Sequence, residues 1–401
     1  MNGPPARKLS GIGVAITVLA TLVIAAIAYG ATTRAVHRVA VALPTASPTP
    51  GMPAVSSPSP IEPSPAPPPR LSIWGFDLAN AATGWLLLSN CTQPRTGECQ
   101  FMVAATGDGG QTWSAPVQVG PSYDPTDGGA PRTVRFINAV DGFVYGSGGA
   151  FATHDGGKTW SALDLPATFF DAISGRGQTV WAATYPCPKG TVCAYEVRLS
   201  HDGGRSWSAP RRLPGGFFPS DLIPLGTSSA LLSGPSSGDL EMTSDGGNTW
   251  RAIKGQCSEG YFRAPIASSD GQEIWELCLG IPGNASAVKV LFVSEDGGKS
   301  WSRKASSQDS GQLPSLGTQV SLVSTRPHTL LVSTDQTPLL MTRDVAASWI
   351  QVGKSPTGGT LRLTFANGND GWAMDVAQTT IWSTTDGGES WTPLPSYNPA
   401  P

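Results

Sequence analysis

An eight-residue segment that occurs seven times constrains the fold of this chain more than any other feature. Six copies keep the pattern hydroxyl, any residue, Asp, Gly, Gly, any residue, hydroxyl, Trp, as in TGDGGQTW at 106–113 and SHDGGRSW at 200–207. The aspartates of consecutive copies are 47, 47, 43, 51, 48 and 42 residues apart. With 48 Gly, 36 Pro and only 14% charged residues, a period in the forties is typical of a β-propeller with one four-stranded blade per repeat. The chain is therefore predicted to be all-β with seven blades.

The residues between the boxes divide each repeat into strands. About 24 residues before most boxes stands a glycine followed by an aromatic residue, as in NAATGWLLL at 80–88 and NGNDGWAMD at 367–375. We interpret this signal as the turn into a second strand. A third strand then leads into each box, as EVRLS does before residue 200, and a fourth leaves from the box tryptophan.

These segments resemble the Asp-box, or bacterial neuraminidase, repeat, and the chain is similar to seven-bladed propellers of the photosystem II assembly and stability factor type. The resemblance implies that each box forms the hairpin between the third and fourth strands of a blade. In that hairpin the aspartate can accept hydrogen bonds from turn N–H groups, the glycines can take positive φ, and the tryptophan can pack beside the turn. The structural pairs are Asp108 and Trp113, Asp155 and Trp160, Asp202 and Trp207, Asp245 and Trp250, Asp296 and Trp301, Asp344 and Trp349, and Asp386 and Trp391.

The boxes are not expected to be reaction centres. His201 occupies the second position, where other copies have residues as different as Gly107, Glu295 and Thr385. Seven acids spaced around a ring cannot share one substrate. The sixth box has Val345 and Ala346 in place of the glycine pair, so its turn is expected to adopt a different geometry or to be looser.

The N-terminal part of the chain predicts export. Residues 9–33 contain no charge over 25 residues, long enough to span a bilayer, and follow a short basic segment, 1–8, predicted to be cytoplasmic. A signal anchor and a cleaved signal peptide both fit, and the length favours the anchor. Residues 34–70, with 11 prolines between 44 and 69, are expected to be a disordered linker. The propeller would then cover 71–397, outside the cell.

The six cysteines all follow the linker, as expected for disulfides in an oxidising compartment. We pair Cys91 with Cys99, Cys187 with Cys193, and Cys257 with Cys278. No CxxC occurs and the four histidines are scattered, so no metal is expected, and no motif calls for a cofactor.

The charge of the folded region disfavours nucleic acid as a partner, because residues after 70 carry 21 Lys and Arg against 28 Asp and Glu. We expect a monomer that binds a protein or a glycan without chemistry. A sialidase is disfavoured by the blade count and by the missing Arg-Ile-Pro signature. A different glycoside hydrolase is the alternative, and it would need two carboxylates at catalytic spacing. The acids considered for that pair are Asp124, Asp127, Asp171 and Asp221.

Arginines on the first strands are the candidate ligand-binding residues. First strands line the channel of a propeller, and those of blades 2, 5 and 7 contain Arg132, Arg135, Arg263 and Arg362. Two interpretations are open. The arginines either pair with acids of neighbouring first strands or form a cationic funnel for a carboxylate-bearing glycan or an acidic segment of a partner. The acids concerned are Asp77, Asp171 and Asp221.

The two ends of the propeller predict how the ring closes. Repeat 1 begins with its own first strand near Ile73, and repeat 7 ends with its own fourth strand after Trp391. We therefore expect blades 1 and 7 to meet through side-chain packing, without exchange of a strand.

Overall fold

The computed structural model describes most of the chain beyond residue 70. The described ranges are 71–91, 98–123, 130–147, 149–165, 169–186, 194–214, 217–234, 239–257, 261–263, 265–309, 313–352, 361–375 and 380–397. The predicted anchor at 9–33 and the predicted linker at 34–70 lie outside them. No helix within the described ranges is long and apolar enough to cross a membrane.

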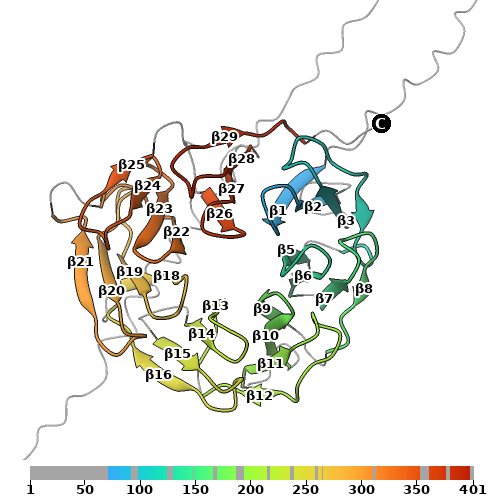
Figure 1. The fold of residues 1–401 in the computed structure, drawn as a ribbon, viewed down its shortest axis with the longest axis horizontal. Coiled ribbons are helices and arrows are strands. Elements are labelled where there is room, and N and C mark those ends of the chain that lie inside the picture. Colours follow the sequence, from blue (N-terminus) through green and yellow to red (C-terminus); the bar gives the residue numbers. More distant parts are fainter. Residues whose placement is uncertain are drawn as a thin grey trace, which may run out of the picture. The chain divides into compact units, whose positions relative to one another are not determined.

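Seven antiparallel sheets, each built from consecutive strands, are arranged as a ring (Figure 1). Blade 1 comprises β1 (Ser72–Leu78), β2 (Gly84–Cys91), β3 (Cys99–Thr106) and β4 (Val117–Gln118). Blade 2 comprises β5 (Pro131–Phe136), β6 (Gly142–Gly146), β7 (Gly149–Thr153) and β8 (Ser161–Ala162). Blade 3 comprises β9 (Phe169–Arg176), β10 (Thr179–Tyr185), β11 (Glu196–Ser200) and β12 (Arg211–Arg212). Blade 4 comprises β13 (Asp221–Pro224), β14 (Ala230–Ser233), β15 (Asp239–Thr243) and β16 (Arg251–Lys254).

The remaining three blades follow the same order. Blade 5 has its first strand in two pieces, β17 (Tyr261–Arg263) and β18 (Ile266–Ala267), followed by β19 (Ile274–Gly280), β20 (Lys289–Ser294) and β21 (Ser302–Ser306). Blade 6 comprises β22 (Val320–Arg326), β23 (Thr329–Thr334), β24 (Leu340–Thr342) and β25 (Ile350–Gln351). Blade 7 comprises β26 (Leu361–Phe365), β27 (Gly371–Asp375), β28 (Ile381–Thr384) and β29 (Thr392–Pro393). The prediction of seven four-stranded blades is confirmed.

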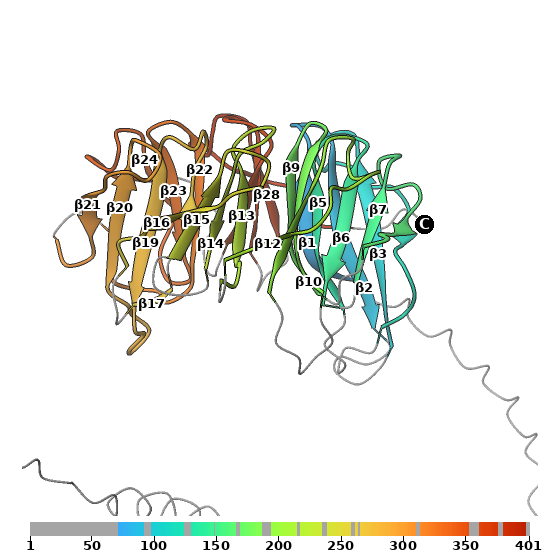
Figure 2. The same cartoon turned by 90° about the horizontal axis from the view of Figure 1, so that it is seen from below.

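The strand directions sort the turns onto two faces (Figure 2). Because neighbouring strands are antiparallel, the turn after each first strand and the box after each third strand lie on one face, which we call the box face. The starts of the first strands and the connections between second and third strands lie on the other, the loop face. First strands are innermost and surround the centre of the ring (Figure 1).

The hydrophobic core lies between adjacent blades. Trp85 on the second strand of blade 1 stacks on Phe136 of blade 2, with ring centroids 3.4 Å apart, and its indole N–H donates to the carbonyl oxygen of Gly156 at 2.9 Å. Gly156 belongs to the box of blade 2. The aromatic residue of the glycine–aromatic signal therefore fixes one blade to the box of the next.

The ring closes without strand exchange, as predicted. β1 pairs with β2 and β29 pairs with β28, and among the described strands no sheet combines residues of blades 1 and 7. Trp372 of blade 7 packs against Phe76 and Trp113 of blade 1 at centroid distances of 6.4 and 5.9 Å. Aromatic packing thus supplies the contact that a shared strand would otherwise provide.

Two of the three predicted disulfides are present. Cys91–Cys99 closes the loop between β2 and β3, and Cys257–Cys278 ties the connection after blade 4 to β19. Cys187 and Cys193 lie outside the described residues. Since the closed loops span 8 and 21 residues, the second disulfide removes more entropy from the unfolded chain.

Candidate functional site

The box aspartates are fully engaged in their own turns. In the box of blade 3, Ser200 Oγ donates to Asp202 Oδ1 at 2.7 Å, and the backbone N–H of Ser206 donates to the same oxygen at 2.9 Å. The Ser206 hydroxyl donates to Oδ2, so both carboxylate oxygens are used. The same three bonds recur in all seven boxes, which leaves none of these acids free to act on a substrate.

The sixth box keeps this geometry despite lacking its glycines, so the expectation of a different or looser turn is wrong. Val345 and Ala346 adopt φ of 56° and 64°, the left-handed region that glycines occupy in the other boxes. The N–H of Ala346 still donates to Thr342 Oγ1 at 2.9 Å, and that of Ser348 to Asp344 Oδ1 at 2.9 Å. The hydrogen bonds of the hydroxyls and the aspartate hold the turn, although the left-handed backbone is unfavourable for a β-branched valine.

The box tryptophans pack beside their own turns, but to different depths. Trp113 and Trp391 are buried, and the other five are half-buried. The indole N–H of Trp207 donates to the carbonyl oxygen of Gly204 at 3.0 Å, a contact repeated in blades 2 and 7. The boxes therefore stabilise the blades and do not form a binding site of their own.

The first strands enclose a central channel, which we define by three cavities that all include Arg135 in their lining. A cavity of about 300 Å³ lies toward the loop face, where several first strands begin, and one of about 430 Å³ extends along the middle of the first strands. A third, of about 620 Å³, is lined by turns of the box face, such as those at Arg176 and Arg326. Volumes of this size are typical of sites for small ligands or single side chains of a partner.

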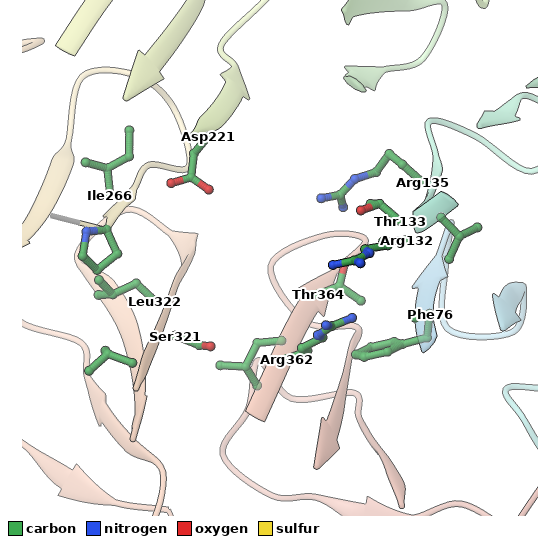
Figure 3. Close-up of a pocket in the computed structure, with 15 residues that line it drawn as sticks. Phe76, Arg132, Thr133, Arg135, Asp221, Ile266, Ser321, Leu322, Arg362 and Thr364 are labelled. Carbon is green, nitrogen blue, oxygen red and sulfur yellow. The ribbon is translucent and has the colours of Figure 1, made fainter. Parts of the chain in front are cut away.

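Three of the four predicted arginines line the smallest of these cavities. Arg132 and Arg135 come from β5, and Arg362 comes from β26 across the joint between blades 7 and 1. Figure 3 shows their guanidinium groups pointing into the same space. Arg263 belongs to β17, but its side chain lies outside the described part of the chain.

The three arginines differ in their partners. Arg135 forms an ion pair with the buried Asp77 at 3.5 Å, while 40% of its side chain remains exposed. The Arg362 guanidinium donates to the carbonyl oxygen of Trp74 at 2.6 Å, which links blade 7 to blade 1. Arg132 is exposed and has no ion pair or hydrogen bond to another described residue. Arg132 is therefore the arginine most available to a ligand.

Asp77 joins the innermost strands of three blades. Its carboxylate accepts hydrogen bonds from the backbone N–H of Phe136 at 2.7 Å and from Thr364 Oγ1 at 3.0 Å, in addition to the ion pair with Arg135. Burial raises the pKa of Asp77, and the positive charge of Arg135 and the hydrogen bonds only partly oppose that rise. Arg135 thus forms the pairing with Asp77 that the first of the two interpretations expects, and this pair links blades 1 and 2.

The other two candidate partners of the arginines belong to the first strands of blades 3 and 4. Asp171 of β9 and Asp221 of β13 both line the 430 Å³ cavity. Asp221 Oδ2 accepts a hydrogen bond from Ser233 Oγ at 3.1 Å. Among the described ion pairs none connects Asp171 or Asp221 to Arg132, Arg135 or Arg362.

Two β-bulges direct charged side chains into the channel. In β5, Pro131 and Thr133 pair with adjacent residues of β6, so Arg132 between them is an extra residue. In β9, Asp171 is the extra residue at the corresponding position, between Phe170 and Ala172. Side chains alternate along a regular strand, so without its bulge Arg132 would face away from the side that carries Arg135, three residues later. Local backbone irregularity therefore places one cation and one anion at the channel.

The surroundings of Asp171 perturb its ionisation. It is exposed to the channel, yet partial burial between the channel walls raises its pKa to about 6. Of the acids considered for a hydrolase, Asp171 and Asp221 thus share one cavity. Asp124 and Asp127 lie outside the described residues.

Buried acids elsewhere were not predicted from the sequence. Glu276 on β19 is fully buried beside the Cys257–Cys278 disulfide and accepts a hydrogen bond from the backbone N–H of Gln256 at 2.7 Å. The Glu276 carboxylate and the sulfur atoms of Cys257 and Cys278 lie within 4.8 Å of one another, as the ligands of a metal ion would. The two sulfur atoms are bonded to each other in the disulfide, so they are not thiolate ligands. The only signal in the sequence was the acid inside an apolar strand, EIWELCL.

Comparisons with known proteins agree with this architecture. Residues 125–393 match the family described as photosynthesis system II assembly factor YCF48. No protein of curated function matches the sequence. YCF48 from Cyanidioschyzon merolae is similar in structure, with a TM-score of 0.50 and 15% identity over 80% of this chain and 95% of that one.

Two further solved structures show the range of similar propellers. A YCF48 bound to a D1 peptide gives a TM-score of 0.47 and 20% identity, covering 65% of this chain and 80% of that one. An ancestral GH74 enzyme, AFV00434, gives a TM-score of 0.50 and 15% identity, covering 81% of this chain and 48% of that one. At these identities the likeness is one of fold.

Proposed function

Because the chain belongs to the photosystem II assembly factor YCF48 family, we propose that it is a non-catalytic binding protein whose channel arginines bind carboxylates of a protein partner. The description of the family as an assembly factor supports a protein as the partner. A glycan that carries carboxylates offers the same chemistry, and it is the competing ligand.

The observation that carries this proposal is the position of Arg132 and Arg362. They come from different blades, line one cavity, and are both exposed (Figure 3). Arginine presents a planar fork of N–H donors that matches a carboxylate in a bidentate pair. Arg135 is held by Asp77 and contributes charge without needing to move.

We also propose that the chain is exported and held at the membrane. The support is the uncharged segment 9–33 and the proline-rich segment 34–70 that follows it. Resistance of the chain to alkaline extraction from membranes, together with access of added protease to the propeller on intact cells, tests this. Release of the chain by alkali would contradict an anchor and favour a cleaved signal peptide.

Binding is tested with the purified full chain in detergent and fluorescein-labelled hexapeptides that carry two aspartates. We expect Arg132→Ala to weaken binding about tenfold, in line with the loss of one charge-assisted contact. The matched control is Arg212→Ala, since Arg212 is an exposed arginine on the outermost strand β12. Equal affinity of wild type and Arg132→Ala would refute the arginine site.

A glycoside hydrolase is the second candidate, favoured by one observation. Asp171 and Asp221 line a single cavity, and a carboxyl with its pKa raised to about 6 suits a general acid. Release of reducing sugar from extracellular polysaccharides by wild type, and its loss in Asp171→Asn, would establish the enzyme. No release from any polysaccharide would leave the binding function.

A further inference from the structure

The channel has walls of opposite charge. Arg132, Arg135 and Arg362 stand on blades 2 and 7, whereas Asp171 and Asp221 stand on the neighbouring blades 3 and 4. Figure 3 shows the Asp221 carboxylate across the cavity from the Arg135 guanidinium. The two groups line the same two cavities but form no ion pair, because the sheets that carry them hold them apart.

The bulges make this separation a fixed feature of the backbone. One bulge aims Arg132 into the channel from β5, and the corresponding bulge aims Asp171 into it from β9. Both strands are hydrogen-bonded to a second strand, so the backbone positions from which these charged side chains project are fixed. Opposite charges held apart in this way are preorganised for a ligand that contacts both.

The acidic wall also has the surroundings that a basic side chain prefers. Burial and the negative charge of the nearby Asp171 raise the pKa of Tyr195. The ring of Tyr195 packs against Tyr185 at a centroid distance of 4.9 Å and against Phe218 at 5.4 Å. Phe218 is 54% exposed. Aromatic faces attract cations and also cover the apolar stem of a lysine or arginine.

We propose that the loop-face end of the channel binds a dipolar peptide segment, with a carboxylate toward Arg132 and Arg362 and a lysine or arginine side chain toward Asp171 and Asp221. The inference rests on the proposed binding function and makes it more specific. The carboxylate is supplied either by an acidic side chain or by the C-terminus of the partner.

The test is a set of labelled hexapeptides measured against the full chain in detergent. The reference peptide is amidated and carries one lysine two residues before an aspartate pair, and a second peptide has glutamine in place of the lysine. A third has a free C-terminal carboxylate and no aspartate, so that it separates the two sources of the anion. We expect wild type to bind the lysine peptide about tenfold more tightly than the glutamine peptide.

Variants assign this preference to the acidic wall. In Asp171→Asn with Asp221→Asn, the two peptides should bind alike, whereas Arg132→Ala should weaken both by the same factor. Asp164→Asn is the matched control, because Asp164 is an exposed acid outside the lining of the channel cavities. Asp221→Lys provides a test that loss of folding cannot imitate, since it should reverse the preference toward a peptide with glutamate in place of the lysine.

The outcomes separate this inference from the proposed function. If wild type binds the lysine and glutamine peptides equally while Arg132→Ala loses both, the arginine site stands and the dipolar ligand is refuted. If wild type binds no acidic peptide, the proposed function fails and the dipolar ligand fails with it. A preference for lysine that survives both asparagine substitutions would also overturn the assignment.

Discussion

Asp77 of β1 accepts a hydrogen bond from the backbone N–H of Phe136 on β5 at 2.7 Å, so a side chain of blade 1 binds the backbone of the innermost strand of blade 2. The same carboxylate accepts from Thr364 of blade 7 and pairs with Arg135. Because the ring closes without a shared strand, this one acid couples the last blade to the first two.

We expect Asp77→Ala to lower the free energy of unfolding by about 2–4 kcal/mol, because two buried donors and one cation lose their acceptor. Asp77→Asn keeps an acceptor for the N–H of Phe136 and should cost less. Urea denaturation of the full chain measures both. If the alanine variant were as stable as wild type, the coupling of the three blades through Asp77 would be refuted.

The left-handed backbone of the sixth box makes a separate prediction. Replacing Val345 and Ala346 by glycine should stabilise the protein by about 1–2 kcal/mol in total, since relief of strain exceeds the added entropy of the unfolded chain. Gly297→Ala in the fifth box is the matched control, because its φ is +70° and the nearest atom to the added Cβ is 3.6 Å away. It should destabilise by about 1 kcal/mol, for conformational reasons alone.

These two sites show what the sequence could and could not predict. The blade count, the strand order and the placement of the boxes follow from the spacing of one motif, because each copy marks the same hairpin. The expectation for the sixth box is wrong because this turn does not require glycines: the hydrogen bonds of Thr342, Asp344 and Ser348 hold it.

The channel was only partly predictable for a different reason. The first strands and their arginines follow from counting back from the glycine–aromatic signal. The bulges at Arg132 and Asp171 each add one residue to a strand, a change too small to be recognised in the spacing of the repeats. Each bulge nevertheless changes the side of the strand to which the added residue's side chain points. The ion pair between Arg135 and Asp77 joins strands of different blades, and the spacing of the repeats does not reveal which residues face each other there.

The box acids predict a characteristic loss of stability in acid. The hydroxyl and backbone hydrogen bonds from Ser300, followed by that from Ser294, lower the pKa of Asp296 from 3.8 to about 2. A group with a lowered pKa contributes stability that is complete above the unfolded value and is lost as the pH falls through the folded one. We expect the melting temperature to fall between pH 4 and pH 2, and to fall less steeply in Asp296→Asn. Parallel curves for the two proteins would show that this box carries no titrating carboxylate.

Glu276 predicts the opposite dependence at higher pH. Burial raises its pKa from 4.5 to about 7, against hydrogen bonds from the N–H groups of Gln256 and Cys257, and its Oε1 has no partner among the described residues. The folded protein therefore binds more protons than the unfolded chain between these two values, so stability falls as the pH rises through them. Above pH 7 the cost of ionising a buried acid is fully present.

Replacing Glu276 by glutamine should remove this cost. We expect Glu276→Gln to be more stable than wild type by about 2–3 kcal/mol at pH 8 and to differ little at pH 4, following the free energy of a pKa shift of this size. Glu295→Gln is the control, because Glu295 lies on the surface in an ion pair with Lys304 at 3.5 Å. Chemical denaturation with the disulfides intact, at pH 4, 6 and 8, measures the difference. An advantage of Glu276→Gln that did not grow with pH would show that the acid is already ionised, and hydrated, in the folded protein.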